Sequence, residues 1–555
     1  MSADAAVPNH DSDHPAATTA ATTAATTAAA KAETATRAGK GGERVVAVIE
    51  LGSTGIRLLI ASVDEGGDYR VLDHAGKPSR VGRDVFTNGV VSREVTRECI
   101  AILAGFKELL RGYGIGPAEA RVVATSALRE AGNRDTFIDR VALQTGFHVD
   151  IIEDLEENHL MYLAVVHALS DERRILTRAN ALILEVGGGS TEIMLLRRGR
   201  MVASHSLRIG TVRIDEFVRG TGQVAASLRQ FLEDNVRTAC DLLDEELSLE
   251  GIKTFIVIGS DARLAAARRA TERAEQYSIV PRDDYVRFVE EIGALSTEEA
   301  VARLGVSWSD AESLGSGLTI QRLFLERTGA EQVIVPSVSI REGLLHTLAT
   351  GPDPEHEEEM HRQITASAIS LGRKFHFDED HALQVATLAL GLFEALRREH
   401  GLGARERLLL EVAGILHDIG TFIRTSGHHK HSEYIIQNSE IFGLSLNESA
   451  VVANVARYHR KGQPTNTHVN YIALSREDRT VVRKLAAMLR IADALDRGHD
   501  QRVSAVAVER REDRLVIRVS GKDGGPSPDL SLERLSLGEK GDMFEDVFGM
   551  EPVLA

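Results

Sequence analysis

Cysteine is nearly absent from this sequence, whose 555 residues contain only Cys99 and Cys240. Two distant cysteines exclude a disulfide scaffold and a cysteine-based zinc site, and they are typical of a reducing compartment. A positive excess is also missing, because 65 Lys and Arg against 82 Asp and Glu leave a formal net charge of −17. Without that excess we expect no general nucleic-acid partner, although a local basic groove for a polyanion is not excluded.

Long hydrophobic runs are missing as well. No apolar stretch reaches the ~18 residues that a membrane helix needs. The N-terminus also lacks the apolar segment of a signal peptide. We therefore expect no membrane partner and a cytoplasmic location. The hydrophobic fraction of 43% is high enough for real cores. At ~150 residues per domain, the length suggests about three or four domains.

The texture of the chain changes several times along its length. Residues 1–42 are mostly Ala and Thr and predict a disordered tail. Strand and helix patterns alternate through 43–350, which predicts α/β folding. A Pro- and Glu-rich linker follows, and 360–500 then show helical periodicity almost throughout. The last segment, 501–555, returns to strand alternation and predicts a small C-terminal α/β appendage.

The α/β part contains an internal repeat. The segment ELGSTG begins at Glu50, and the segment EVGGGS begins at Glu185. Each follows an apolar strand, places an acid before a Gly/Ser loop, and leads into a second apolar strand. Because the two copies are about one domain apart, we predict two homologous lobes, 43–175 and 176–350.

The two Gly/Ser loops are candidate phosphate sites. Such a turn directs several backbone N–H groups into one concavity, which suits phosphate oxygens, and an acid beside it can hold Mg²⁺ through water. A single loop of this kind is as often a glycine-rich hairpin tip without a ligand as it is a phosphate site. Two copies with the acid at the same offset favour a paired phosphate clamp. Neither loop is a Walker motif, because no Gly-Lys-Ser/Thr occurs there and a strand follows instead of a helix.

Several ordered motifs resemble one known family. Besides the two loops, they are ATSALREAGNRDTF around Arg129, EDLEENHLMYLAV around Glu157, SLRIGTVRI and IREGLL. The chain is similar through them to the exopolyphosphatase / guanosine-pentaphosphate phosphohydrolase family over about residues 44–550. The resemblance implies two actin-like (ribonuclease H-like) lobes, then an all-α HD-type domain and the small α/β appendage. It also implies a homodimer.

The resemblance assigns roles to individual residues. It places the general base at Glu157, a phosphate-neutralising cation at Arg129, and Glu192 among the catalytic residues. Without it, Glu156 and Glu157 would be interpreted as a solvated helix face. The acids Glu50 and Glu185 would hold Mg²⁺. The implied phosphate-binding residues are Gly52, Ser53, Thr54, Arg57, Gly187, Gly188, Gly189, Ser190 and Thr191.

This sequence departs from the family pattern at five places. Both acids before the loops are Glu where the family has Asp, which lengthens each side chain by one methylene. The Ser-Asn-Ser of the first loop is Ser-Thr-Gly here, at 53–55, and the Ser-Gly before the Glu pair is Glu-Asp, at 153–154. The expected Gly-Gly-Thr turn is Gly-Ser-Asp, at 259–261.

The helical region, 360–500, contains most of the histidines that follow the predicted tail. His381, the pair His417-Asp418, and Asp493 fall on separate helical patterns. A lone histidine on such a helix is usually a packing or capping residue, but this set resembles the metal site of HD phosphohydrolases. Imidazole and carboxylate ligands suit Mn²⁺, Fe²⁺ or Mg²⁺.

Three functions follow from these patterns. The first is Mg²⁺-dependent hydrolysis of terminal phosphoanhydride bonds of inorganic polyphosphate, guanosine pentaphosphate or both. The second places the chemistry in the HD site and makes the lobes a sensor of nucleotide or polyphosphate. The third is a non-catalytic regulatory binding protein. The sequence leaves both substrates open, because each ends in the same phosphoanhydride.

Overall fold

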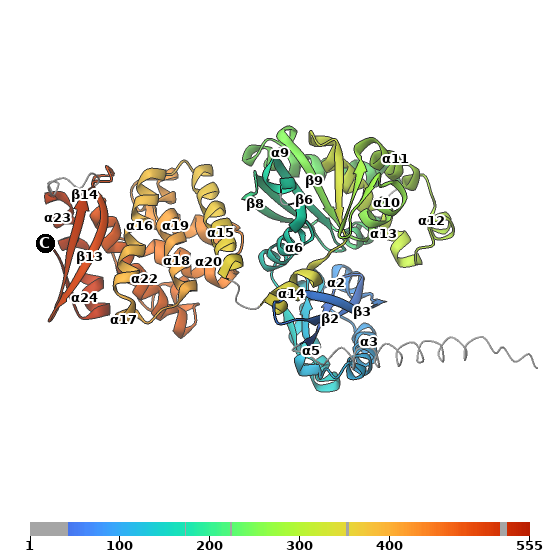
Figure 1. Cartoon of the computed structure of the whole chain (residues 1–555), viewed down its shortest axis with the longest axis horizontal. Helices are drawn as coiled ribbons and strands as arrows, with labels where there is room; N and C mark the ends of the chain where they lie inside the picture. Colours follow the sequence, from blue (N-terminus) through green and yellow to red (C-terminus); the bar gives the residue numbers. More distant parts are fainter. Residues whose placement is uncertain (1–42, 173, 222–224, 351–353, 522–529) are drawn as a thin grey trace, which may run out of the picture.

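A computed structural model describes residues 43–172, 174–221, 225–350, 354–521 and 530–555. The predicted tail, 1–42, lies outside the described residues. Two α/β lobes lie at one end of the molecule, and a helical region that finishes in a small sheet lies at the other (Figure 1). No helix in the described ranges combines the length and the apolar character that crossing a membrane requires.

The first lobe is built on a five-stranded sheet in the order β3-β2-β1-β4-β5. Its central strands are rich in Val, Ile and Leu because both of their faces are covered. β1 runs antiparallel to β2 and parallel to β4. The strands are β1 (Arg44–Leu51), β2 (Gly55–Val63), β3 (Tyr69–Pro78), β4 (Arg121–Ala124) and β5 (Val149–Ile151).

The second lobe repeats this topology in a seven-stranded sheet, ordered β10-β11-β12-β9-β6-β7-β8. Its portion β8-β7-β6-β9-β12 has the same sequence of antiparallel and parallel neighbours as the first sheet, so the predicted repeat is confirmed. The strands are β6 (Asn180–Val186), β7 (Thr191–Arg197), β8 (Arg200–Leu207), β9 (Ile252–Ile258), β10 (Glu272–Arg273), β11 (Tyr277–Pro281) and β12 (Gln332–Pro336).

Helices flank both sheets. Those nearest the junction of the lobes are α2 (Val81–Asn88), α3 (Arg93–Gly112), α4 (Ser126–Glu130), α6 (Asp154–Ala168), α8 (Thr211–Thr221), α10 (Ser260–Arg269), α13 (Trp308–Arg327) and α14 (Ile340–Thr350). The last of these, α14, returns to the first lobe and packs on α6 and β1 (Figure 1). A Cβ at Gly343 would lie 2.0 Å from the Leu160 carbonyl oxygen, so only glycine permits this approach. The boundaries 43–175 and 176–350 stay a prediction.

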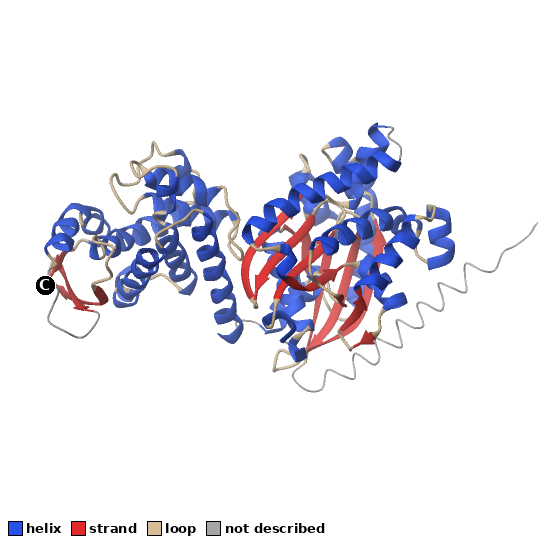
Figure 2. Cartoon of the chain, turned by 90° about the horizontal axis from the view of Figure 1, so that it is seen from above, coloured by secondary structure: helices blue, strands red, loops and turns tan. Residues whose placement is uncertain are grey.

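The helical region follows the described part of α15 (Pro354–Lys374), which packs against β8. Figure 2 shows that helices alone make up this middle part of the molecule, whereas strands lie at both ends. Its main helices are α16 (Glu379–Ala395), α18 (Ala404–Leu416), α19 (His428–Gln437), α20 (Leu446–Arg457) and α22 (Arg476–Leu495). Their apolar faces meet in one core that also includes residues of the first lobe and of the C-terminal sheet.

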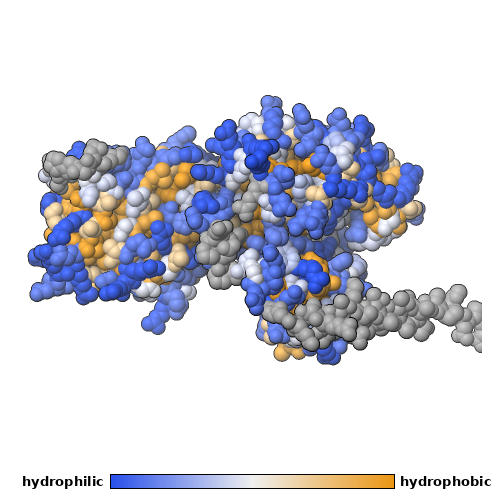
Figure 3. Space-filling model, viewed as in Figure 1, coloured by the Kyte–Doolittle hydropathy of each residue, from blue (hydrophilic) through white to orange (hydrophobic). Residues whose placement is uncertain are grey.

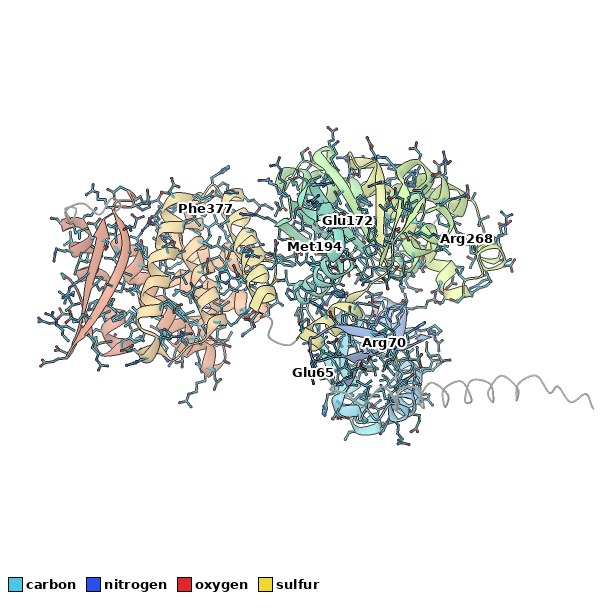
Figure 4. The ribbon with its side chains drawn as sticks, viewed as in Figure 1. Glu65, Arg70, Glu172, Met194, Arg268 and Phe377 are labelled. Atoms are coloured by element: carbon cyan, nitrogen blue, oxygen red, sulfur yellow. The ribbon has the colours of Figure 1, made fainter. Side chains whose placement is uncertain are left out.

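The C-terminal appendage is a three-stranded sheet in the order β13-β14-β15, with two helices beside it. Its elements are β13 (Val503–Arg511), β14 (Arg514–Gly521), α23 (Ser531–Lys540), α24 (Asp542–Phe548) and β15 (Glu551–Leu554). Orange, apolar residues are visible over this end of the molecule, whereas blue, hydrophilic residues cover much of the visible surface of the lobes (Figure 3). In Figure 4, Met194 lies inside the second lobe, on β7, and Phe377 belongs to the helical region.

Candidate functional site

A cavity of about 140 Å³ lies where the two lobes meet, and both Gly/Ser loops line it. The loops have the same geometry: the Gly52 N–H donates to the Gly55 carbonyl at 3.0 Å, and the Gly187 N–H donates to the Ser190 carbonyl at 2.9 Å. The strand register repeats too, because Glu50 pairs with Arg57 and Glu185 with Glu192 across their hairpins. Arg57 and Glu192 are therefore equivalent positions of the repeat.

The loops lie directly against one another. A Cβ at Gly188 would be 2.8 Å from Ser53 Cβ, and a Cβ at Gly189 would be 2.5 Å from Ser126 Oγ. Ser53 Oγ and Ser126 Oγ share a hydrogen bond of 3.1 Å. Side chains at these glycines would push the lobes apart, so both glycines allow the lobes to make contact, and Gly188 also lines the cavity.

Most of the predicted phosphate-binding residues face this cavity. The residues that line it are Gly52, Ser53, Thr54, Arg57, Gly187, Gly188 and Ser190. Thr191 does not, because it is fully buried and its hydroxyl donates to the Ile209 carbonyl. Gly189 is likewise absent from the lining.

Glu157 projects into the cavity from the first turn of α6, and its side chain is 12% exposed. Its neighbour Glu156 is exposed, so the solvated-face interpretation describes Glu156 and not Glu157. Burial raises the pKa of Glu157 to about 7, against the opposing effect of Arg129. Arg129 Nη1 lies 3.4 Å from Glu157 Oε2, and its other nitrogen binds Asp154. Arg129 thus lies beside Glu157, in an adjoining polar pocket.

Glu192 is buried behind Glu157 and is held by neutral donors. Asn158 Nδ2 donates to one carboxylate oxygen at 3.1 Å, and Ser206 Oγ donates to the other at 2.8 Å. Burial raises the pKa of Glu192 well above its usual range, and Glu157 adds to the increase. Asp154, Glu157 and Glu192 each offer an oxygen within 4.8 Å of the others, a spacing suited to a cation.

Glu50 and Glu185 have contrasting surroundings. Glu50 is ion-paired, 3.2 Å from Arg341 Nε and 3.9 Å from Arg57 Nη1. Oε2 of Glu185 is buried and has no hydrogen-bond partner among the described residues. Burial raises the pKa of Glu185 to about 8, and the nearby Glu157 and Glu50 add to the increase. Of the two predicted Mg²⁺ ligands, Glu185 is therefore the one with an open oxygen.

Three further lining residues were not singled out from the sequence. Arg263 on α10 and Arg341 on α14 join Arg57 to give the cavity three guanidinium groups. Asp261, at the turn where the family pattern differs, also lines it, and burial raises its pKa to about 7. The motif IREGLL contains Arg341 and could have identified it, whereas no local signal marks Arg263.

The helical region contains a second cluster of titratable groups. His381, His417, Asp418 and Asp493 come together there, and groups of their ligand atoms lie within 4.8 Å of one another. They come from α16, from the end of α18 and from α22. Nε2 of His381 and Nε2 of His417 are buried without a hydrogen-bond partner in the described ranges.

His428 and His459 also belong to this cluster. Nε2 of each faces Asp418 Oδ1, at 2.9 and 3.4 Å, and the two Nε2 atoms are 3.2 Å apart. Nδ1 of His417 lies 2.7 Å from the Gly414 carbonyl, and Nδ1 of His428 and of His459 faces a backbone carbonyl in the same way. A carbonyl only accepts, so each Nδ1 carries a proton. Burial lowers the pKa of His417 and of His459, and these two neutral rings direct an Nε2 lone pair inward. Asp418 raises the pKa of His428 although burial opposes this, and Nε2 of His428 donates to that carboxylate.

One member of the cluster comes from the C-terminal appendage. The Lys540 ammonium, at the end of α23, donates to Asp493 and is buried. Lys540 and His459 contribute to the pKa of Asp493, which lies far below its usual range although burial opposes this. The C-terminal appendage therefore contributes a buried cation to this cluster.

Comparisons with known proteins agree with this architecture. The model of the Ppx/GppA phosphatase family matches residues 59–350, and that of Ppx/GppA phosphatase domain III matches 362–537. A "Guanosine-5'-triphosphate,3'-diphosphate pyrophosphatase" of Pseudoalteromonas translucida is 26% identical over 421 residues, 75% of this chain and 81% of the relative. A relative of the same name from Aliivibrio fischeri is 23% identical over 501 residues, 86% of this chain and 91% of the relative.

A solved structure is similar in fold. The exopolyphosphatase of Cytophaga hutchinsonii superposes with a TM-score of 0.50 at 18% identity, over 56% of this chain and 99% of that protein. This likeness covers the actin-like part of the fold, and the family models match both the lobes and most of the rest of the chain. The chain is therefore a hydrolase that belongs to the Ppx/GppA phosphatase family.

Proposed function

We propose that this protein hydrolyses terminal phosphoanhydride bonds of guanosine pentaphosphate, of inorganic polyphosphate, or of both, with Mg²⁺. The observation that carries the proposal is Glu157, a carboxylate with a raised pKa at a cavity walled by two phosphate-type loops and three arginines. The names of the relatives support phosphoanhydride substrates.

The residues of the cavity account for the chemistry. The loop N–H groups and the guanidinium groups of Arg57, Arg263 and Arg341 would bind the terminal phosphate and disperse its charge. Glu157 would orient a water and accept its proton. The water oxygen bonds to phosphorus as the bridging P–O bond breaks, and the shortened substrate leaves with the bridging oxygen. Arg129 and Glu192 would position Glu157.

The cavity fits a divalent cation at one side. Glu157, Glu192 and the open Oε2 of Glu185 line the cavity, and Asp154 of the adjoining pocket offers an oxygen close to those of Glu157 and Glu192. Carboxylate oxygens are the donors that Mg²⁺ prefers. Bound there, the ion would neutralise charge on the phosphate oxygens. We propose Glu50 and Glu185 as the pair of Mg²⁺ ligands. Glu50 would bind the ion while it remains paired with Arg57 and Arg341.

A direct test is the release of phosphate from both substrates by wild type, Glu157→Gln and His417→Ala. The proposal requires turnover by wild type, loss in Glu157→Gln and retention in His417→Ala. Turnover that survives in Glu157→Gln and disappears in His417→Ala would move the chemistry to the helical cluster. Loss in neither variant would overturn both assignments.

The helical cluster favours a second candidate function, a metal-dependent phosphohydrolase site of HD type. Its open Nε2 atoms and carboxylates suit Mn²⁺ or Fe²⁺. We propose His381, His417, Asp418 and Asp493 as its ligands, with His428 and His459 beside them. We also propose a homodimer, which light scattering of the full chain would test.

A further inference from the structure

A second cavity opens beside the catalytic one and differs from it in character. Its volume is about 700 Å³, within the roughly 300–1,000 Å³ typical of small-molecule sites, whereas the catalytic cavity of about 140 Å³ has room only for terminal phosphates. The two cavities share four lining residues, which are Ser53, Thr54, Ser309 and Ser313. A ligand whose phosphate occupies the first cavity can therefore place its remainder in the second.

The walls of the second cavity are apolar where a phosphate chain would need cations. Ala101 and Ile102 of α3 and Pro78 at the end of β3 form the side from the first lobe, and Val212 of α8 contributes from the second. Trp308, the only tryptophan in the sequence, lines the cavity at the start of α13 and is 53% exposed. A polyphosphate has no apolar part to match these walls, whereas a nucleobase has one.

Polar groups around the opening suit the rest of a nucleotide. Lys77, Arg80 and Arg83 line the same cavity together with the acids Glu98, Asp215 and Glu312, and Arg80 pairs with Glu98 at 2.5 Å. The Trp308 Nε1–H donates to Glu312 Oε1 at 3.3 Å, which orients the indole. Arg83 pairs with Glu312 at 3.1 Å and with Glu216 at 2.9 Å, so it links α2 of one lobe to α13 and α8 of the other (α2 and α13 are labelled in Figure 1).

We propose that this cavity, lined by Trp308, Ile102 and the basic residues Lys77, Arg80 and Arg83, binds the nucleoside part of a guanosine polyphosphate. The purine stacks on Trp308, and the basic residues receive phosphates carried on the ribose away from the reacting end. The inference rests on the proposed function for the terminal phosphate, and it assigns a nucleotide, as distinct from a plain phosphate chain, to this site.

The fluorescence of the single tryptophan tests the site without catalysis. The full-length Glu157→Gln protein is titrated with guanosine pentaphosphate and with inorganic tripolyphosphate, exciting at a wavelength where guanine does not absorb. We expect saturable quenching of about one quarter or more by the nucleotide and an unchanged spectrum with tripolyphosphate. Equal changes with both ligands, or none with either, would overturn the inference.

Kinetics of wall variants give a second, independent readout. Loss of one base-aromatic stack should raise KM for guanosine pentaphosphate about tenfold in Trp308→Ala, with Trp308→Phe close to wild type. Ile102→Glu, on the opposite wall, should behave like Trp308→Ala, and Leu143→Ala on an exposed face of the first lobe is the control. Polyphosphate turnover should stay within twofold in every variant; equal losses for both substrates would contradict the site.

The two proposals fail in different ways. If wild type hydrolyses neither substrate, the proposed function is wrong, and the fluorescence titration still decides whether the nucleoside binds. If wild type hydrolyses guanosine pentaphosphate while Trp308→Ala and Ile102→Glu match it in KM, the reaction stands and the nucleoside site is wrong.

Discussion

At the scale of single residues, the carboxylates of the central cavity differ in their ion pairs, hydrogen bonds and pKa values because their surroundings differ. Glu50 is neutralised by two arginines, Glu185 has an unpaired oxygen, and Glu192 is held by neutral donors. Glu157 combines access to the cavity, a hydrogen-bonded arginine and a pKa of about 7. A pKa near the working pH is what efficient proton transfer needs, so these surroundings support our proposal that Glu157 is the base.

The first prediction concerns this base. Glu157→Gln should lower kcat by about 10²–10⁴-fold and leave the fold intact, because only the proton acceptor is lost. The exposed neighbour Glu156→Gln should retain wild-type turnover. Since the base acts as the carboxylate, kcat/KM of wild type should rise with pH and level off above about 7. A profile that falls between pH 5 and 7, or full activity in Glu157→Gln, would exclude this role.

The second prediction concerns the histidine cluster. Burial lowers the pKa of His417, and of His459 to about 3, so both are neutral and able to bind metal at pH 7. Protein purified without chelator should contain about one or two equivalents of a divalent transition metal by elemental analysis. His417→Ala with Asp418→Ala should remove it, while the exposed His148→Ala should not. Metal-free protein after every supplementation would refute the site.

At the scale of elements, the paired loops hold the lobes together through close contacts. Gly188 lies against Ser53 and Thr54, and Gly82 of α2 packs on Ser53 from the other side. Gly188, Ser53 and Thr54 also line the central cavity, so a change in the distance between the lobes changes the cavity walls. A larger side chain at these glycines would therefore strain the contact between the two lobes.

The third prediction concerns this contact between the lobes. Gly188→Ala adds a Cβ 2.8 Å from Ser53 Cβ and should destabilise the protein by about 1–3 kcal/mol with a large loss of kcat. Gly105→Ala, a helical site in α3 with nothing within 4 Å, should leave activity unchanged and raise Tm slightly. Activity assays and thermal unfolding of both variants check this; equal behaviour would show that the loops tolerate separation.

At the scale of the whole molecule, α15 joins the helical region to the lobes by covering the edge of the second sheet. β8 is the outer strand of that sheet, and an uncovered edge leaves backbone groups unpaired. Gln363 on α15 supplies partners: the Met201 N–H donates to its Oε1 at 2.7 Å, and its Nε2 donates to the Gly199 carbonyl at 2.8 Å. Lys374 adds an ion pair with Glu246 at 2.5 Å.

The fourth prediction concerns this junction. Gln363→Leu leaves two backbone groups of the β8 turn without partners, at about 1–3 kcal/mol each. In calorimetry, the unfolding transitions of the lobes and of the helical region should then lie further apart in this variant than in wild type. The adjacent exposed Arg362→Ala should unfold as wild type does. Identical thermograms for the Gln363 and Arg362 variants would contradict the role of Gln363.

Local pattern in the sequence was enough for the architecture of the lobes and for the outline of both clusters. The repeated strand, acid, glycine and strand pattern predicted two similar sheets, because a one-dimensional pattern sets strand, turn and burial. Helix periodicity placed His381, the pair His417-Asp418, and Asp493 on separate helical patterns, and they come from α16, the end of α18 and α22. These features depend on neighbours in sequence.

Tertiary structure alone decided which distant side chains share a site. Arg263, Arg341 and Asp261 reach the cavity only because α10 and α14 converge on the loops, and Lys540 reaches Asp493 only because the appendage packs on α22. The contrast between Glu50 and Glu185, equivalent in the repeat, likewise arises from which arginine each one meets. Long-range packing sets these contacts and the burial that shifts each pKa, and no local pattern encodes either.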